Sequence, residues 1–225
     1  MTEIRELRIA IEGGTGVSAL LMRPADARWM LVLAHGAGAG MRHGFMEALA
    51  EGLAGVGVGT LRYQFPYTEE GRGVPDRPKV LTATVSAAVR AAREAASGLP
   101  LLAGGKSMGG RMSSQAAAEG LLDGVRGLVF FGFPLHPPKQ PGTKRAEHLS
   151  KVPMPMLFLQ GTRDALADLK LLQPICKELG PRATLQLIET ADHSFHVLKK
   201  SGRSDQEVLQ ELAATTASWA EKIAG

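Results

Sequence analysis

The 225-residue sequence has one cysteine, no long apolar run and no cluster of like charges. A single cysteine, Cys176, cannot form an internal disulfide, which excludes a small secreted scaffold held together by disulfides. Cys176 stands among apolar residues at helical spacing, with Leu172 and Leu179 four before and three after it. This pattern favours a buried, small apolar side chain over a reactive thiol.

The sequence offers no segment for membrane insertion or export. No apolar stretch approaches the ~20 residues that span a bilayer. The first eight residues, Met-Thr-Glu-Ile-Arg-Glu-Leu-Arg, alternate charged and apolar side chains and lack the apolar core of a signal peptide. We therefore expect no membrane association and a cytoplasmic location.

The net charge is positive, but the basic residues are dispersed. Lysine and arginine number 26 against 22 acidic residues, which gives a formal charge of +4 and a pI near 9.4. Adjacent basic residues occur only at Lys144-Arg145 and Lys199-Lys200, and no basic run is interleaved with aromatics. A solvated surface of mixed charge explains this better than a nucleic-acid site, so no nucleic-acid partner is expected.

Motifs for metals and nucleotide cofactors are missing as well. The chain has no His-Glu-x-x-His and no paired cysteines. The Gly-x-Gly pairs at 36–38 and 55–57 fail the dinucleotide fingerprint, because Met41 and Thr60 stand where its third glycine is required. We expect no metal and no nicotinamide or flavin cofactor.

The order of the predicted elements indicates an α/β fold in one domain, residues 1–225. The rhythm of strand, loop and helix predicts a mostly parallel twisted sheet with helices on both faces, preceded by an antiparallel hairpin that Gly13-Gly14 interrupts. The Pro-rich segment 134–151 is too short for a separate lid domain. Strands are predicted over 4–11, 17–22, 29–34, 58–63, 101–103, 127–131, 155–160 and 184–188, helices over 44–56, 80–97, 112–119, 167–179 and 204–223, and a loop over 64–79.

The pentapeptide Gly105-Lys106-Ser107-Met108-Gly109 lies between a predicted strand and a predicted helix. In that context Gly-x-Ser-x-Gly is typical of a nucleophile elbow, a sharp turn that forces strained backbone angles on the serine and needs glycines where a side chain would collide. A phosphate-binding loop would need glycine at position 100, where the chain has proline. A chance match in a Gly-rich protein is the remaining alternative.

Three polar residues follow directly after predicted strands, at the carboxyl edge where α/β sheets form their sites. They are Ser107, Asp164 and His193. A serine hydroxyl needs a base within hydrogen-bond reach, and the imidazole needs a carboxylate to fix its tautomer. Their order, Ser then Asp then His, is that of the hydrolase sheet. We predict Ser107 as nucleophile, His193 as base and Asp164 as the orienting acid.

Neighbouring residues offer alternatives for two of these roles. His196 is a second candidate for the base, but His193 lies nearer the strand end. Asp168 is a second candidate for the acid, but it falls in a predicted helix. We interpret Asp192 as a structural hydrogen-bonding residue and His35 as a residue that orders its Gly-rich loop.

An oxyanion formed on the substrate would need two donors. The backbone N–H of Met108, at the start of the predicted helix, is one candidate. The other is expected from the Gly-rich loop after the third strand, where Ala37 is preferred and Gly38 is the alternative. Lys106, beside the nucleophile, could attract an anionic substrate, but we expect it to point to solvent.

Aromatic side chains after the fourth strand could form the substrate pocket. Tyr63 and Phe65 would supply an apolar wall, and Arg62 would hold an acidic group or a loop carbonyl. Ordinary loop packing is the alternative interpretation of this segment.

The chain resembles the α/β-hydrolases of the small, dienelactone-hydrolase-like kind, and within them a group related to the hydrolase-fold subunit of the mammalian KAT8 regulatory complex. The resemblance covers most of the chain and implies serine hydrolase chemistry on a carbonyl substrate. Dienelactone hydrolases proper resemble it in fold but use a cysteine nucleophile, so their substrate is not carried over. The segments that carry the resemblance are 35–38, 62–67, 104–111, 133–138, 160–164 and 191–196.

The expected function is hydrolysis of a small carboxylic ester or thioester through an acyl-enzyme, with an ester-like small molecule as the only partner. The sequence does not predict an oligomeric state. Two alternatives remain: a non-catalytic scaffold or binding protein of the same fold, and an acyltransferase or peptidase that uses the same triad. The short Pro-rich loop predicts an open, shallow site that prefers short acyl chains.

Overall fold

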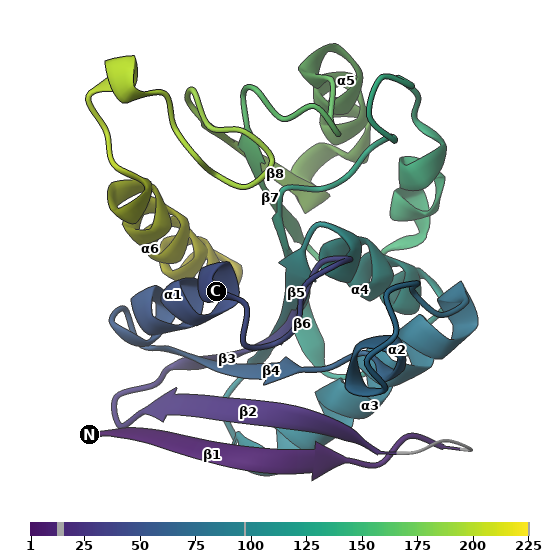
Figure 1. Cartoon of the computed structure of the whole chain (residues 1–225), viewed down its shortest axis with the longest axis vertical. Helices are drawn as coiled ribbons and strands as arrows, with labels where there is room; N and C mark the ends of the chain where they lie inside the picture. The colour runs from purple at the N-terminus through teal and green to yellow at the C-terminus, as the bar shows by residue number, and fades with distance from the viewer. Residues whose placement is uncertain (13–15, 97, 225) are drawn as a thin grey trace.

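The computed structural model describes residues 1–12, 16–96 and 98–224, and its centre is an eight-stranded sheet (Figure 1). The strand order is β1-β2-β4-β3-β5-β6-β7-β8, and all neighbours are parallel except that β2 is antiparallel to both β1 and β4. The predicted sheet is confirmed; the break at Gly13-Gly14 lies outside the described residues. The strands are β1 (Thr2–Ile9), β2 (Val17–Pro24), β3 (Trp29–Ala34), β4 (Val58–Tyr63), β5 (Leu101–Lys106), β6 (Val125–Phe131), β7 (Met156–Gly161) and β8 (Ala183–Ile188).

Helices cover both faces of the sheet, as predicted. The helices are α1 (Gly44–Ala54), α2 (Pro66–Glu69), α3 (Pro78–Ala95), α4 (Met108–Ala118), α5 (Leu169–Leu179) and α6 (Asp205–Ala224), with 3₁₀ turns η1 (Lys144–Lys151), η2 (Gly180–Arg182) and η3 (Lys199–Ser201). Helices α1 and α6 enclose one core, in which Leu49 and Leu212 pack against the sheet. Helices α3, α4 and α5 enclose the other core, which contains Val85, Met112 and Leu172.

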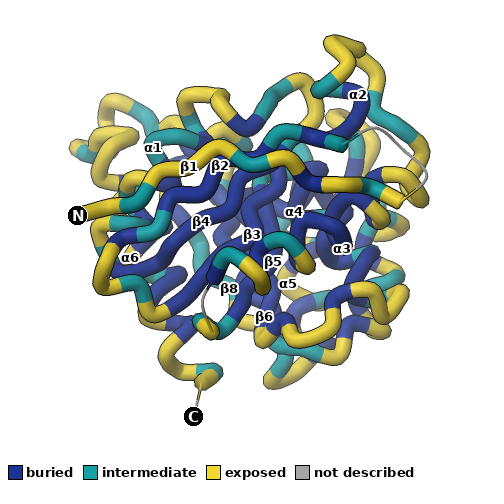
Figure 2. The backbone as a smooth tube through the Cα atoms, turned by 90° about the horizontal axis from the view of Figure 1, so that it is seen from below, coloured by how far each residue is buried: buried dark blue, intermediate teal, exposed yellow. Residues whose placement is uncertain are grey.

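The burial of the strands follows this layering. The six residues of β3 and the six of β4 are all buried, because helices lie above and below them. The edge strand β1 is largely exposed and lies along the border of the buried sheet in Figure 2. The apolar runs in the sequence therefore mark the central strands, and the alternating run marks the edge.

Two segments between strands differ from the expectation or refine it. Residues 64–79, predicted as a loop, contain the short helix α2, which Pro66 begins at a position where the missing N–H costs nothing. Segment 134–151 ends in η1, which is tied to α4 by a 2.7 Å hydrogen bond between Ser114 and His148. The segment forms no separate lid domain, as its length predicts.

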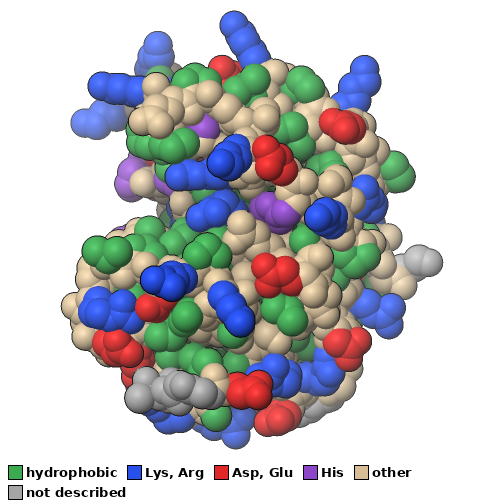
Figure 3. Space-filling model, turned by 90° about the vertical axis from the view of Figure 1, so that its right-hand side faces the viewer, with side chains coloured by type: hydrophobic (Ala, Val, Ile, Leu, Met, Phe, Trp, Pro, Cys, Tyr) green, Lys and Arg blue, Asp and Glu red, His purple; other side chains and the backbone are tan. Residues whose placement is uncertain are grey.

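The surface carries mixed charge, and the helices are those of a globular layer fold. On the face shown in Figure 3, Lys and Arg side chains and Asp and Glu side chains are both spread over the surface. Among the helices that the structure describes, none combines the length and the apolar character needed to cross a bilayer.

Candidate active site

Ser107 forms the corner between β5 and α4. Its backbone has φ 51° and ψ −117°, a region that non-glycine residues rarely occupy. The Ser107 N–H donates to the Phe131 carbonyl of the adjacent strand at 3.2 Å. The strained geometry predicted for a nucleophile elbow is therefore present, and it presents the hydroxyl beyond the carboxyl ends of the strands.

The flanking glycines are required by the close approach of β3. A Cβ on Gly105 would lie 2.2 Å from the Ala34 carbonyl oxygen, and a Cβ on Gly109 would lie 2.5 Å from the same oxygen. Contacts that short are excluded for any side chain, so both positions need glycine to let the elbow lie against β3. The pentapeptide is thus accounted for by packing on both sides of Ser107.

Ser107, His193 and Asp164 lie in hydrogen-bond sequence, although they are far apart along the chain. The His193 Nε2 is 2.9 Å from the Ser107 Oγ, and the His193 Nδ1 is 2.7 Å from the Asp164 Oδ2. The Asp164 side chain is fully buried, whereas that of His193 is 24 % exposed. A carboxylate only accepts, so Nδ1 carries the imidazole proton and Nε2 is left to accept from the serine hydroxyl.

Asp164 is held by groups that the sequence did not single out. Its Oδ1 accepts from the Leu166 N–H at 2.8 Å, and its Oδ2 also accepts from the Gln160 Nε2 at 2.6 Å. The other end of the buried Gln160 amide, Oε1, accepts from the Phe133 N–H at 3.0 Å. The sequence signal for this role was the position of Gln160, a polar residue near the end of the otherwise apolar strand β7. At that position its side chain reaches the loop that follows β6.

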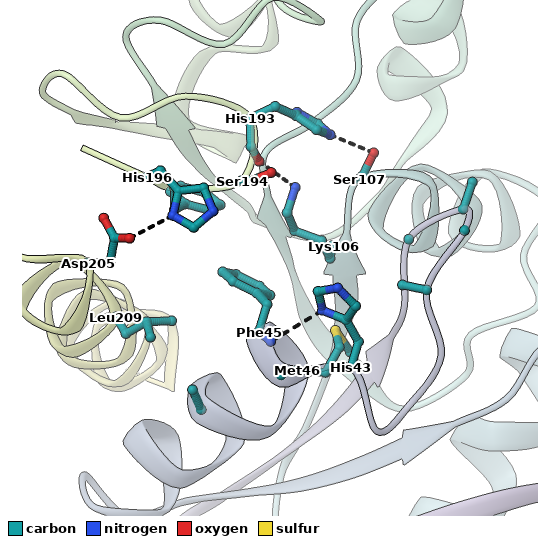
Figure 4. A pocket seen from close by; sticks show the side chains of 17 residues that line it. His43, Phe45, Met46, Lys106, Ser107, His193, Ser194, His196, Asp205 and Leu209 are labelled. Carbon is teal, nitrogen blue, oxygen red and sulfur yellow. Dashed lines mark hydrogen bonds and ion pairs between the residues drawn. The ribbon is translucent and has the colours of Figure 1, made fainter. Parts of the chain in front are cut away.

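The alternative residues have other partners. His196 Nδ1 pairs with Asp205 at 2.6 Å on the exposed rim and points away from Ser107 (Figure 4). Asp168 is the N-cap of α5 and accepts from the N–H of the second helical residue at 2.9 Å. Asp192 accepts from two backbone N–H groups of its own turn at 2.8 and 3.0 Å, as expected of a structural residue.

His35 orders the Gly-rich loop, as predicted. It is completely buried; its Nδ1 donates to the Gly36 carbonyl at 2.8 Å, and its Nε2 accepts from the Phe65 N–H at 3.1 Å. Burial lowers the pKa of His35, which keeps the ring neutral. These bonds fix the loop that carries Ala37, which lines the same cavity as Ser107.

A cavity of about 530 Å³ opens beside Ser107 and His193 (Figure 4). Its lining includes the Gly-rich loop with Ala37, the rings of Phe45 and Phe195, whose centroids are 5.8 Å apart, and Leu209 of α6. This volume is in the range of sites that enclose a small organic ligand.

Arg62, Tyr63 and Phe65 do not line this cavity, so the prediction of a pocket wall at these positions is wrong. Their exposed fractions are 2 %, 0 % and 0 %. The Arg62 Nη1 donates to the carbonyl of Met41 at 3.0 Å, so it does hold a loop carbonyl, but inside the protein. The physical reason is that the carboxyl end of β4 is covered by α2 and by the loop before α1.

Lys106 also departs from the expectation. It was predicted to point to solvent, but its Nζ donates to the backbone carbonyl of His193 at 2.6 Å and its side chain is only partly exposed. Burial lowers the pKa of the Lys106 ammonium to about 8. The residue before the nucleophile is thus bound to the residue that supplies the imidazole.

Cys176 is buried, as predicted, and burial raises the pKa of its thiol to about 11. Within residues 1–12, 16–96 and 98–224, no three His, Cys, Asp or Glu side chains are grouped so as to hold a metal ion.

Comparisons with known proteins agree with the fold. The family model described as "Alpha/beta hydrolase domain" matches residues 27–221. A dienelactone hydrolase from Anabaena variabilis superposes with a TM-score of 0.76 at 21 % identity, covering 97 % of this chain and 96 % of that one. A serine hydrolase without a lid from Xanthomonas campestris gives 0.77 at 20 % identity, with 97 % and 96 % covered. An esterase from Pyrococcus furiosus gives 0.76 at 15 % identity, with 100 % and 92 % covered.

Proposed function

Because the chain belongs to the alpha/beta hydrolase domain family, we propose that it hydrolyses a small carboxylic ester or thioester through an acyl-enzyme on Ser107. The observation that carries the proposal is the hydrogen-bonded sequence from Ser107 through His193 to Asp164, beside a cavity large enough for a small substrate. The Xanthomonas campestris and Pyrococcus furiosus proteins, which share the fold, are named as a serine hydrolase and an esterase.

In the first half of the reaction, the Ser107 oxygen attacks the carbonyl carbon while His193 Nε2 takes the hydroxyl proton. Asp164, hydrogen-bonded to Nδ1–H, stabilises the imidazolium that forms. The imidazolium then gives the proton to the leaving alcohol or thiol as its bond to carbon breaks. In the second half, water loses a proton to His193, attacks the acyl-enzyme and releases the acid, and the proton returns to Ser107.

The negative charge on the carbonyl oxygen needs donors that are already in place. Met108 begins α4, and the first N–H groups of a helix have no acceptor within the helix. Ala37 lies on the cavity wall with Ser107. We assign the backbone N–H groups of Met108 and Ala37 to the oxyanion, where the loss of one such donor costs about 3–4 kcal/mol.

The cavity gives the substrate an apolar environment between α1 and α6. Phe45, Met46, Phe195 and Leu209 contribute the apolar wall that the sequence had assigned to the end of β4. An acyl chain of several carbons would lie between the aromatic rings and Leu209. The expected preference for short acyl chains is thus replaced by a preference for chains that fill this space.

Steady-state hydrolysis of p-nitrophenyl esters of two to twelve acyl carbons tests the proposal. Wild-type protein should release p-nitrophenol with a maximum at intermediate length, and Ser107→Ala should lower kcat by at least about 10³-fold. Ser150→Ala, an exposed serine away from the cavity, is the matched control. Folded wild-type protein that is no faster than Ser107→Ala on every ester would rule out the enzyme and favour a binding protein.

A further inference from the structure

Lys106 connects the nucleophile corner to the loop that carries the catalytic base. It is the last residue of β5 and directly precedes Ser107. Its side chain extends to the neighbouring loop, where Nζ donates to the His193 carbonyl at 2.6 Å (Figure 4). The two segments that must meet for proton transfer are therefore joined by a charged hydrogen bond, which is stronger than a neutral one.

The ammonium group is enclosed by aromatic rings on the cavity side. Its Nζ lies 5.5 Å from the ring centroid of Phe195 and 5.8 Å from that of Phe45. Distances of this size are those of cation–π contacts, which stabilise a cation that has lost part of its water. Phe195 belongs to the same loop as His193, so these contacts fix that loop at a second point.

Gly132 shows how close this cation lies to the His193–Asp164 pair. A Cβ at Gly132, which has φ +73°, would lie 3.3 Å from Lys106 Nζ and 3.5 Å from both Asp164 Oδ2 and His193 Cε1. The three side chains thus surround one small volume that a glycine leaves open. A charge at this place acts on the imidazole through protein rather than through bulk water.

We propose that Lys106 is a positioning residue for His193: through the His193 carbonyl and the Phe195 ring, it holds the base-bearing loop in the place from which the imidazole reaches Ser107. This inference rests on the proposed hydrolase function of the same site. It assigns a role to the second residue of the Gly-x-Ser-x-Gly segment, which the elbow geometry alone leaves unspecified.

Removal of the ammonium group should lower the rate of reaction at Ser107 by about tenfold or more in Lys106→Met, because the loop that carries His193 is then less well fixed. Lys106→Arg keeps a charged donor that can bind the His193 carbonyl, so it should recover most of the rate. A residue that only fills space would give no such recovery by a charged donor.

The test is the second-order rate of labelling by a fluorophosphonate probe, measured at pH 7 on the whole chain. Lys106→Met tests the proposal and Lys106→Arg, which keeps the charge, tests rescue. Lys170→Met, the same substitution on an exposed lysine of α5, controls for net charge. Thermal unfolding midpoints identify any variant that fails to fold, and Lys106→Gln then replaces Lys106→Met.

The proposal expects the labelling rate to fall by about tenfold or more in Lys106→Met, to be mostly recovered in Lys106→Arg, and to keep its wild-type value in Lys170→Met. A wild-type labelling rate in folded Lys106→Met, or an equal loss in folded Lys106→Arg, overturns the proposal, while the labelled wild-type protein leaves the proposed function intact. Absence of Ser107-dependent labelling in folded wild-type protein overturns the proposed function itself, and the inference with it.

Discussion

Replacement of Lys106 by methionine should remove a rise in stability that the wild-type protein shows between about pH 8 and pH 10. Burial lowers the pKa of the Lys106 ammonium from its ordinary value near 10.5 to about 8. The folded protein therefore loses this proton at lower pH than the unfolded chain does. Between those two values the unfolded chain binds more protons, so the free energy of unfolding must increase with pH.

The structure sets the size of this effect. The separation between 10.5 and about 8, at about 1.4 kcal/mol per pH unit, corresponds to at most about 3.5 kcal/mol. It is an upper bound because the side chain is partly exposed to the cavity, where water screens part of the charge. Below pH 8 the folded protein carries the whole cost of the buried cation, and above pH 10 it carries almost none.

Other buried groups act in the opposite direction and must be separated from Lys106. Burial raises the pKa of Cys176 to about 11 and that of the Tyr63 phenol further still, so both ionise first in the unfolded chain. Each lowers stability as pH rises through its unfolded value. Because both groups are present in the variant too, the difference between wild type and Lys106→Met isolates the lysine.

The assay is urea unfolding at pH 7, 8, 9 and 10, with the exposed-site variant Lys170→Met as control. The free energy of unfolding of wild type relative to Lys106→Met should increase by about 1–3 kcal/mol between pH 7 and pH 10. The free energy of unfolding of Lys170→Met should change with pH in the same way as that of wild type. If the free energy of unfolding of Lys106→Met shows the same pH dependence as that of wild type, the Lys106 ammonium is not desolvated in the folded protein. That result would refute the prediction.

Three further substitutions test other parts of the site. Asp164→Asn should lower kcat for a p-nitrophenyl ester by about 10⁴-fold, because an amide can donate to His193 and select the wrong tautomer; steady-state kinetics with little change in kcat would remove Asp164 from the mechanism. Gln160→Met should lower the free energy of unfolding by about 1–3 kcal/mol, because it leaves the Phe133 N–H and one Asp164 contact unpartnered; urea unfolding checks this, and an unchanged midpoint would contradict it. Leu209→Ala should raise kcat/KM several-fold, about 3–10-fold, for a dodecanoyl ester relative to an acetyl ester; an equal change for both esters would show that Leu209 does not bound the acyl chain.

The fold was predictable because its signals are local. Continuous apolar runs such as Trp29–Ala34 mark strands that are buried on both faces, and the order of strands and helices limits the topology to a mostly parallel sheet. The starts of the helices that begin with proline were not predicted correctly. The Pro-rich stretch after β4 was predicted as a loop, but Pro66 and Pro78 begin α2 and α3, where proline suits the first turn.

The site was predictable only where chain order and strand ends define it. Ser107, Asp164 and His193 each follow a strand, so the parallel sheet places them at the same edge. The cavity wall was not predictable in this way, since Phe45 and Leu209 come from helices whose placement depends on packing over the whole face.

The hydrogen-bond partners of Arg62 and Lys106 were also not predictable from the sequence. Both are long cationic side chains near strand ends; Lys106 was expected to point to solvent, and Arg62 to hold an acidic group or a loop carbonyl at the pocket. The structure binds each to a backbone carbonyl from a distant loop, Met41 for Arg62 and His193 for Lys106. No local pattern encodes such a partner, because it depends on how two loops approach across the sheet edge.

The central claim is that Ser107 is a nucleophile activated by His193. Peptide mapping of the folded protein after reaction with a fluorophosphonate tests it most directly, with Ser107→Ala and His193→Gln as companions and Ser150→Ala as control. The account predicts one adduct, on Ser107, that is absent from Ser107→Ala, slowed by at least about 10³-fold in His193→Gln and unchanged in Ser150→Ala. A folded wild-type protein that forms no adduct, or forms it on another residue regardless of Ser107, would contradict the account.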